Sequence, residues 1–227
     1  AKKIFAGIFN HITGYPPSFP LTINLLITDQ CNNYCEMCFY KQRHSVKNYI
    51  SGTLTLDEIR KFINTIGNHH PIIKVGGGEP FMRGDLLDII CEIKEKKLKC
   101  LLTTNGSLMD NAVISRLIGL KVDVLIFSLY GPEKIHDKIT GVAGAYKKSL
   151  ENLKYVLKKR NKCTRVLVSS IILPENISDF TFFLADLKSL CIDGIKIEQL
   201  NFLTSGEYNN ALSSNTGGFN LCPSVFI

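Results

Sequence analysis

Runs of apolar and β-branched residues alternate along the chain with segments in which apolar residues recur every three or four positions. Continuous apolar runs are typical of buried strands, whereas the three-to-four spacing is typical of amphipathic helices. Six segments are predicted to be strands, at residues 21–27, 72–75, 98–104, 122–129, 165–173 and 194–202.

Segments with helical spacing follow these strands, at residues 56–66, 85–97, 111–120, 145–159 and 177–190. The first begins with a capping box, because Thr55 precedes it and Glu58 comes three residues later. Asp85 is predicted to cap the second helix, since an aspartate at this position accepts hydrogen bonds from the first free backbone N–H groups.

The order of these elements predicts an α/β fold. Strands that alternate with helices form parallel sheets with right-handed crossovers, and uninterrupted apolar strands fit a sheet buried on both faces. Six β→α steps, the last of them without a clear helix, are compatible with an open doubly wound sheet or with a partial barrel, and periodicity does not choose between the two folds. In both folds, functional groups collect in the loops after the strands.

The 227 residues are enough for one large α/β domain. We expect an N-terminal extension over residues 1–20, a core over 21–204, and a linker or the start of a C-terminal extension over 205–227. The first residue is not Met and no polar tail closes the chain, so we expect a piece of a longer protein. No apolar run reaches the roughly 18 residues of a membrane span, and no secretory signal opens the chain. A cytoplasmic protein without a membrane partner is therefore expected.

The net charge of +7 changes this picture little. Much of the excess lies on helical segments, as in residues 94–97 and 158–160, where it is typical of solvated helix faces. It gives a weak attraction for anionic partners. Because no basic cluster is interleaved with aromatic residues, nucleic acid is not expected as a partner.

The eight cysteines are unevenly distributed, which favours metal chemistry in a reducing compartment over disulfides. Three of them lie within eight residues, at Cys31, Cys35 and Cys38. Four others follow apolar patterns or adjoin strands and are expected to be small buried hydrophobic residues: Cys91, Cys100, Cys163 and Cys191. The eighth, Cys222, precedes a proline near the end of the chain.

The three clustered cysteines occupy the loop after the first predicted strand with the spacing C-x3-C-x2-C. A structural zinc site usually takes four ligands from two separated pairs, and no second pair lies at that distance. A [4Fe–4S] cluster held by three cysteines would leave one iron open to another ligand. This interpretation is favoured, with a zinc knuckle or three unrelated cysteines as the alternatives.

With this loop the chain resembles the radical S-adenosylmethionine (SAM) superfamily. The resemblance implies a partial (β/α)6 barrel in which Cys31, Cys35 and Cys38 hold a [4Fe–4S] cluster and SAM binds the open iron. It further implies reductive cleavage of SAM to methionine and a 5′-deoxyadenosyl radical, with the cofactors carrying the difficult chemistry. Met37 stands where an aromatic residue is frequent in the family, and the backbone from Met37 to Phe39 is expected to approach the adenine.

A glycine-rich turn follows the second predicted strand. Glycines permit close backbone approach to a ligand, and a carboxylate suits an ammonium group. The segment Gly76, Gly77, Gly78, Glu79 and Pro80 resembles the family's GGEP motif, which implies that it takes the amino group of SAM.

Further polar residues match the family in order along the chain. Asn105 belongs to a TNG segment, and Ser128 closes the fourth strand where a family serine often faces SAM. Ser169 or Ser170, with Asn176, is expected to reach the SAM carboxylate, and only one of the two serines points inward because strand side chains alternate.

Several remaining residues receive other interpretations. Thr140 stands where relatives often have arginine, which puts a carboxylate-clamping role in doubt, and His136 and Asp137 are expected to order their loop. Gln199 and Asn201 are candidates to face the substrate, although the family uses this strand to back the adenine. The pair His69 and His70 is expected to be an exposed turn and not a metal site.

The sequence therefore predicts a radical SAM enzyme whose substrate is unidentified, with a peptide or protein favoured over a small molecule. A reductase or flavodoxin is expected as the electron donor. Alternatives are the core of a cobalamin-dependent methyltransferase, an electron-transfer or structural Fe–S protein without SAM chemistry, and a zinc-binding interaction module. Cys222 is either the first ligand of an auxiliary-cluster domain or a free surface cysteine.

Overall fold

The computed structural model describes residues 19–35, 37–38 and 52–199. Its strands are β1 (Thr22–Thr28), β2 (Ile72–Gly77), β3 (Lys99–Thr104), β4 (Val124–Ser128), β5 (Arg165–Ile172) and β6 (Gly194–Gln199). Its α-helices are α3 (Leu56–Ile66), α4 (Leu86–Glu95), α5 (Asn111–Gly119), α6 (Glu133–Thr140), α7 (Ala145–Lys159) and α8 (Phe180–Ser189). Two short 3₁₀ turns, η1 (Gly67–His69) and η2 (Pro80–Met82), flank β2.

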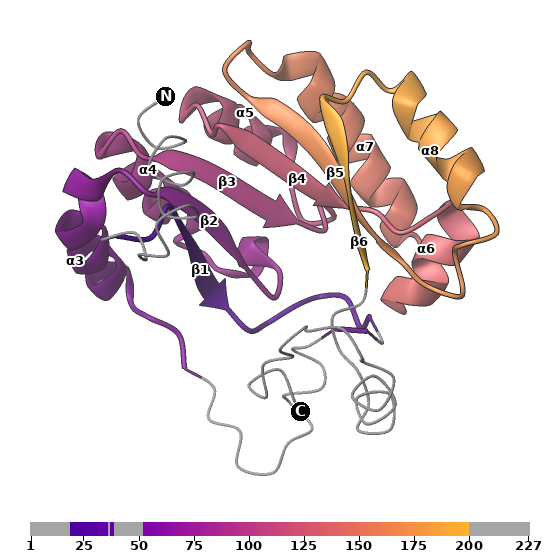
Figure 1. Cartoon of the computed structure of the whole chain (residues 1–227), viewed down its shortest axis with the longest axis horizontal. Helices are drawn as coiled ribbons and strands as arrows, with labels where there is room; N and C mark the ends of the chain where they lie inside the picture. The colour runs from indigo at the N-terminus through magenta and orange to yellow at the C-terminus, as the bar shows by residue number, and fades with distance from the viewer. Residues whose placement is uncertain (1–18, 36, 39–51, 200–227) are drawn as a thin grey trace, which may run out of the picture.

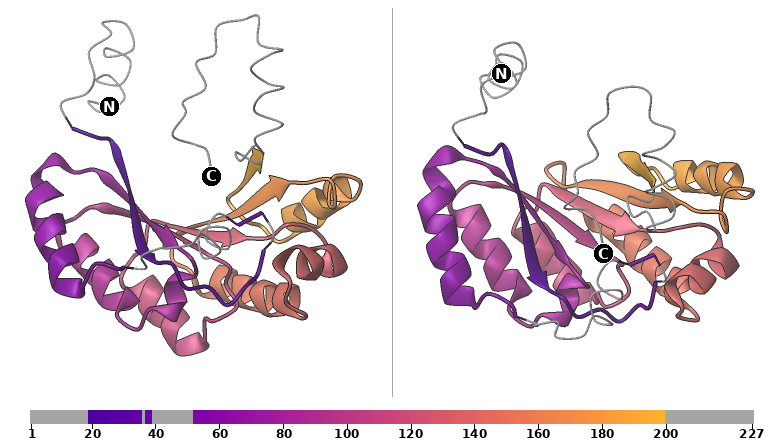
Figure 2. Two further views of the ribbon diagram at one scale, coloured as in Figure 1. Left: turned by 90° about the horizontal axis from the view of Figure 1, so that it is seen from below. Right: turned by 60° about the horizontal axis from the view of Figure 1, so that its bottom comes forward.

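The strands form one six-stranded sheet in chain order, β1-β2-β3-β4-β5-β6, and every neighbouring pair is parallel. A doubly wound sheet would reverse its strand order at a switch point. The unbroken order instead sends each right-handed crossover in the same direction and puts all helices on one side. The fold is therefore the partial barrel, and Figure 2 shows the helices gathered on one side of the curved sheet.

Strand residues alternate between the two faces of the sheet. The helices cover one of these faces (Figure 2), so the core lies between that face and the helices. The outward face of the sheet contributes buried apolar side chains, among them Leu25, Ile73, Leu102, Leu125 and Val168. Helix α3 adds Ile59, Ile63 and Ile66 from one stripe, each contributing roughly 1.5–3 kcal/mol through burial. The other, concave face carries Asn24, Lys74, Leu101, Thr103, Ile126, Ser128, Leu167, Ser169, Lys196 and Glu198.

The carboxyl ends of the strands meet at one edge of the sheet, where the cysteine loop leaves β1 (Figure 1). The capping box of α3 is confirmed, since the Thr55 side chain accepts from the Glu58 N–H and the Glu58 carboxylate accepts from the Thr55 N–H. No helix in the described part of the chain is long and apolar enough to cross a membrane.

Asp85 occupies the N-cap position of α4 but makes no side-chain capping bond, contrary to the prediction. Its carboxylate is bound by the Arg83 guanidinium instead, through Nε to Oδ1 and Nη2 to Oδ2. The same guanidinium donates from Nη1 to the carbonyl of Ile27 at 2.8 Å. The ion pair thereby fixes the start of α4 to the end of β1.

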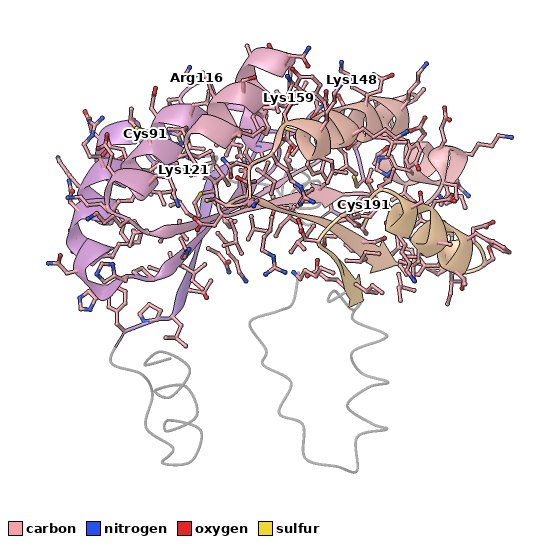
Figure 3. The ribbon with its side chains drawn as sticks, turned by 90° about the horizontal axis from the view of Figure 1, so that it is seen from above. Cys91, Arg116, Lys121, Lys148, Lys159 and Cys191 are labelled. Carbon is pink, nitrogen blue, oxygen red and sulfur yellow. The ribbon has the colours of Figure 1, made fainter. Side chains whose placement is uncertain are left out.

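Two further predictions about elements are corrected. Helix α8 begins at Phe180 and not at 177, and Ile177 is 63% exposed. Helix α6 was not predicted as a helix. Of the four cysteines expected to be buried, Cys100 is fully buried, but Cys163 and Cys191 are exposed and Cys91 is half-buried. Cys191 lies in the turn after α8 with a φ of 57°, outside any packed helix face (Figure 3).

Candidate functional site

The cysteine loop is attached to the core at two places. At the first, the N–H of Gly78 donates to the carbonyl of Thr28 and the N–H of Glu79 donates to the carbonyl of Gln30, each at 2.7 Å. At the second, the N–H of Tyr34 donates to the carbonyl of Thr140, the last residue of α6, at 2.8 Å. The loop therefore crosses the mouth of the partial barrel from β2 to α6.

The three cysteines lie on this loop. The N–H of Cys38 donates to the carbonyl of Cys35 at 3.0 Å, which closes a tight turn between the two residues. Burial is the main cause that raises the pKa of Cys31, and the nearby Glu79 and Cys38 add to it. Burial also raises the pKa of the Tyr130 phenol, followed by the charges of Cys35, Cys38 and Cys31. Tyr130 is thus within electrostatic range of all three cysteines.

Among the described residues, no three His, Cys, Asp or Glu side chains surround a position for a single metal ion. A four-iron cluster places each cysteine on a different iron, so its ligands need not meet at one point. The donor set itself, three thiols on one loop in which Cys31 and Cys38 act on each other electrostatically, fits such a cluster.

Glu79 is a carboxylate enclosed in the protein, with 1% of its surface exposed. The Thr104 hydroxyl donates to Oε1 at 2.7 Å, the Asn105 N–H donates to Oε2 at 2.7 Å, and the Phe81 N–H donates to Oε1 at 3.2 Å. Desolvation raises the pKa of Glu79, and this effect outweighs the three hydrogen bonds, which act to lower it. None of the ion pairs in the described part of the chain includes this carboxylate. Hydrogen bonds within the protein therefore hold this carboxylate in place.

Asn105 is the centre of the polar network next to Cys31. Its side chain donates a hydrogen bond to the Cys31 sulfur and another, at 2.8 Å, to Oδ1 of Asn32. The Asn32 amide in turn donates to the Ser107 hydroxyl at 2.9 Å, and Ser107 donates back to Oδ1 of Asn105. The sequence pointed to Asn105 but missed Asn32 and Ser107. The sequence offered one indication for each: Asn32 directly follows Cys31, and Ser107 directly follows the TNG segment that contains Asn105.

The three glycines before Glu79 have different roles. A Cβ on Gly77 would lie 2.2 Å from the carbonyl oxygen of Thr28, and one on Gly78 would lie 2.1 Å from that of Gln30. Both positions therefore exclude side chains because the cysteine loop packs on them. A Cβ on Gly76 would meet nothing within 4 Å, and it would project from the concave face. This space at Gly76 is one that a ligand could fill.

Serines on the concave face complete the site. Ser128 hydrogen-bonds to the Tyr130 side chain, and Ser169 donates to Oε2 of Glu198 at 2.8 Å. Ser170 lies on the opposite face with Val166 and Val168, is fully buried, and its hydroxyl has no partner among the described residues. Ser169 is therefore the serine that points inward, and Ser170 does not share the face expected for SAM.

Glu198 and two lysines give the concave face its charge. Burial works to raise the pKa of Glu198, but hydrogen bonds from Lys196 and Ser169 outweigh it and lower the pKa. Lys74 of β2 also acts on this carboxylate. Lys74 is exposed and forms no ion pair in the described part of the chain. The face therefore presents two ammonium groups to one carboxylate.

Asn176 does not reach the mouth, contrary to the prediction. It is fully buried, and its amide donates to the carbonyls of Tyr130 and Ile171 at 2.7 and 2.8 Å. Its oxygen accepts from the Leu173 N–H at 2.8 Å. All of these bonds are internal, so Asn176 joins the ends of β4 and β5 and has no donor left for SAM.

His136 and Asp137 order their surroundings, as predicted. The Asp137 carboxylate accepts from the N–H groups of Gly144 and Tyr146 at 2.6 and 2.9 Å. Nδ1 of His136 accepts from the Tyr130 N–H at 3.2 Å. Thr140 turns its hydroxyl to the carbonyl of His136 at 2.9 Å, which gives it a role within α6 and none in binding a carboxylate.

Protonation of His136 is expected to destabilise the fold in acid. Burial lowers the pKa of this imidazole to about 4, whereas the unfolded chain titrates near 6.5. The unfolded state therefore binds a proton that the folded state does not, and the free energy of unfolding falls by about 3 kcal/mol as the pH drops through this window. In urea unfolding followed by circular dichroism, His136→Gln should show a flatter pH profile than the wild type. Parallel profiles would contradict this assignment.

Other predicted residues lie apart or outside the described part. His69 and His70 are exposed, and His69 stacks on Phe19 with ring centroids 3.9 Å apart, which agrees with an ordinary turn. Met37 is half-buried in the loop. Phe39, Asn201 and Cys222 lie outside the described residues, as does the side chain of Gln199.

Comparison with known proteins places this site in a wider group. The model of the Radical SAM superfamily matches residues 25–187. An AdoMet-dependent heme synthase of Nitratidesulfovibrio vulgaris is 29% identical over 169 residues, which covers 73% of this chain and 43% of that protein. The AdoMet-dependent heme synthase of Methanosarcina barkeri is 32% identical over 142 residues, 62% of this chain and 40% of that protein. The chain thus spans less than half the length of these relatives.

Solved structures show the same fold at low identity. Streptococcus suis SuiB bound to S-adenosylmethionine superposes with a TM-score of 0.71 at 16% identity, over 90% of this chain and 46% of that chain. The protein anSMEcpe with bound AdoMet superposes with a TM-score of 0.67 at 21% identity, over 84% of this chain and 55% of that chain.

Proposed function

The chain belongs to the radical SAM superfamily, and from this membership we propose that it is the core of an enzyme that directs a SAM-derived radical at a substrate on its concave face. The [4Fe–4S] cluster and SAM are its cofactors. When bound, they supply the reductive cleavage of the SAM sulfonium to methionine and a 5′-deoxyadenosyl radical. The observation that carries the proposal is the convergence of Cys31, Glu79 and Asn105 at the mouth of the partial barrel.

The chain's own residues have separable parts in this proposal. Cys31, Cys35 and Cys38 would hold the cluster, with the Asn105 amide hydrogen-bonded to the Cys31 sulfur. Gly76 would leave space for the methionyl amine of SAM, and the carboxylate of Glu79 would supply the opposite charge. Ser128 and Ser169 on the concave face would contact the rest of SAM, and the backbone from Met37 to Phe39 would approach the adenine.

The concave face suits a substrate that carries a carboxylate. Lys74 and Lys196 place two ammonium groups beside one carboxylate, and the exposed Leu26 of β1 adds apolar surface. A peptide or protein remains the favoured substrate; SuiB, which shares the fold, was solved with its precursor peptide SuiA. A tetrapyrrole is the second candidate, because the relatives named above are heme synthases.

The alternatives make different predictions about the metal. An electron-transfer or structural Fe–S protein would hold a cluster without cleaving SAM, and a zinc module would be colourless. A cobalamin-dependent methyltransferase would need a cobalamin-binding domain, which we do not assign to the described residues.

The seven described cysteines are all free of disulfides, which suits a reducing compartment, and we place the protein in the cytoplasm.

The test is an anaerobic assay of SAM cleavage. The protein is reconstituted with iron and sulfide, reduced with dithionite and supplied with SAM, and 5′-deoxyadenosine and methionine are quantified by mass spectrometry. Equal amounts of the two products are expected. A protein with a full cluster that forms neither product would favour the electron-transfer alternative.

A further inference from the structure

Positive charge is concentrated on the two helices that follow β4. Residues 133–159, which include α6 and α7, contain seven lysines and three acidic residues, and so carry four of the seven excess charges of the chain. None of the ion pairs in the described part of the structure involves these lysines. The lysines near the junction of α6 and α7 are Lys138, Lys147 and Lys148, here called the junction lysines, and all three are exposed.

The junction lies next to the cysteine loop. The N–H of Tyr34 donates to the carbonyl of Thr140 at the end of α6. A Cβ on Gly141, the next residue, would lie 3.3 Å from the Cβ of Tyr34. Thr140 and Gly141, which contact the cysteine loop, therefore lie in the chain between Lys138 and the pair Lys147 and Lys148.

Three aromatic rings pack against one another near this junction. Tyr130 is within electrostatic range of the three cysteines and stacks on His136 with ring centroids 5.6 Å apart and an interplanar angle of 18°. The His136 ring lies 5.7 Å from the Tyr146 ring, and Tyr146 directly precedes Lys147. The rings thus form a column from Tyr130 to Tyr146, and Tyr146 is followed along the chain by Lys147 and Lys148.

Reductive cleavage of SAM consumes one electron, and that electron has to come from outside the chain. The concave mouth is not a suitable entrance, since SAM and the substrate are proposed to occupy it. The outer side of α6 and α7 is separate from the mouth, and Figure 3 shows Lys148 and Lys159 along the outer side of the helical layer. The carboxylates of Asp186 and Glu133 act electrostatically on the Tyr146 phenol. An acidic partner is expected to be attracted by Lys147 and Lys148 and repelled by these two carboxylates.

We propose that the junction lysines form the docking surface for an acidic one-electron carrier protein of the flavodoxin or ferredoxin class, which reduces the cluster through the Tyr130–His136–Tyr146 column. This inference rests on the proposed function. The carrier loses one electron and the oxidised cluster gains it; no bond forms or breaks, and the rings are only the medium through which the electron passes. Opposite charges on two proteins accelerate their association and fix their orientation.

The experiment compares two reductants on the full-length, reconstituted protein. One is dithionite, a small reductant that needs no docking surface, and the other is a flavodoxin kept reduced by its reductase and NADPH. The test variant is Lys147→Glu/Lys148→Glu. The matched control is Lys158→Glu/Lys159→Glu, which makes the same charge change at the far end of α7. Initial rates of 5′-deoxyadenosine formation are measured against flavodoxin concentration at low and high salt. The Kd for flavodoxin is measured separately by titration calorimetry and should change in parallel with the KM.

The test variant is expected to raise the KM for flavodoxin by about tenfold or more at low salt, and the difference should shrink as salt screens the charges. Its dithionite-driven rate should equal that of the wild type, and the control variant should behave as the wild type with both reductants. Equal losses in the two variants would overturn the proposal, since they would indicate unspecific attraction or an anionic partner such as nucleic acid. An unchanged KM would also overturn it. No product with dithionite in the wild type would instead refute the proposed function.

Discussion

Replacing Cys35 with alanine is expected to abolish both cluster assembly and SAM cleavage. Three thiols hold the proposed cluster, and two remaining ligands leave a second iron without a protein ligand, which exposes the cluster to loss. The fold should survive, because the hydrogen bond that closes the turn with Cys38 is accepted by the backbone carbonyl of Cys35, which the substitution retains. The measurements are iron and sulfide content, the absorption spectrum, and 5′-deoxyadenosine by mass spectrometry.

Cys163→Ala is the matched control, since this cysteine is exposed and lies before β5, outside the loop. It should keep a full cluster and the wild-type rate. If Cys35→Ala retained a full complement of iron and cleaved SAM, Cys35 would not be a ligand. A colourless wild-type protein that contains zinc would favour the zinc-binding alternative instead.

The elements with strong hydrophobic patterns could be located from the sequence. Strand β4 is a nearly continuous apolar run, and α3 has both a buried stripe and a capping box, so local and tertiary preferences agree. Helix α6 was missed because its buried positions include His136 and Thr140, which are polar. A polar residue in a buried position breaks the periodicity on which the prediction depends.

The candidate site was predicted in its chemistry but not in its contacts. Cys31, Glu79 and Asn105 lie on three different segments, and the sequence named each without showing that they hydrogen-bond or act on one another. Which of Ser169 and Ser170 points inward depends on the register of β5 in the sheet. A shift of that register by one residue would exchange the residues on its two faces, and the sequence alone does not set it. Asn176 was misassigned because a buried amide that joins two strand ends looks in sequence like any loop asparagine.

The second large effect is expected at Gly78, where alanine should disrupt the attachment of the cysteine loop. The added Cβ would lie 2.1 Å from the carbonyl oxygen of Gln30 and 2.6 Å from its carbon, and these are backbone atoms that cannot rotate away. To make room, the loop would have to give up the bonds from Gly78 and Glu79 to the carbonyls of Thr28 and Gln30. We expect a loss of about 2–4 kcal/mol in the free energy of unfolding and poor retention of the cluster.

Gly76→Ala separates this structural role from ligand binding, because it makes the same chemical change two residues away. Its Cβ would meet no atom within 4 Å, so the free energy of unfolding and the cluster content should match the wild type. That Cβ would instead enter the space proposed for SAM, and the Kd for SAM, measured by titration calorimetry, should rise. Equal stability losses in both variants would mean that the turn tolerates no side chain at any position. Unchanged SAM affinity in Gly76→Ala would remove Gly76 from the SAM site while leaving the loop attachment at Gly78 intact.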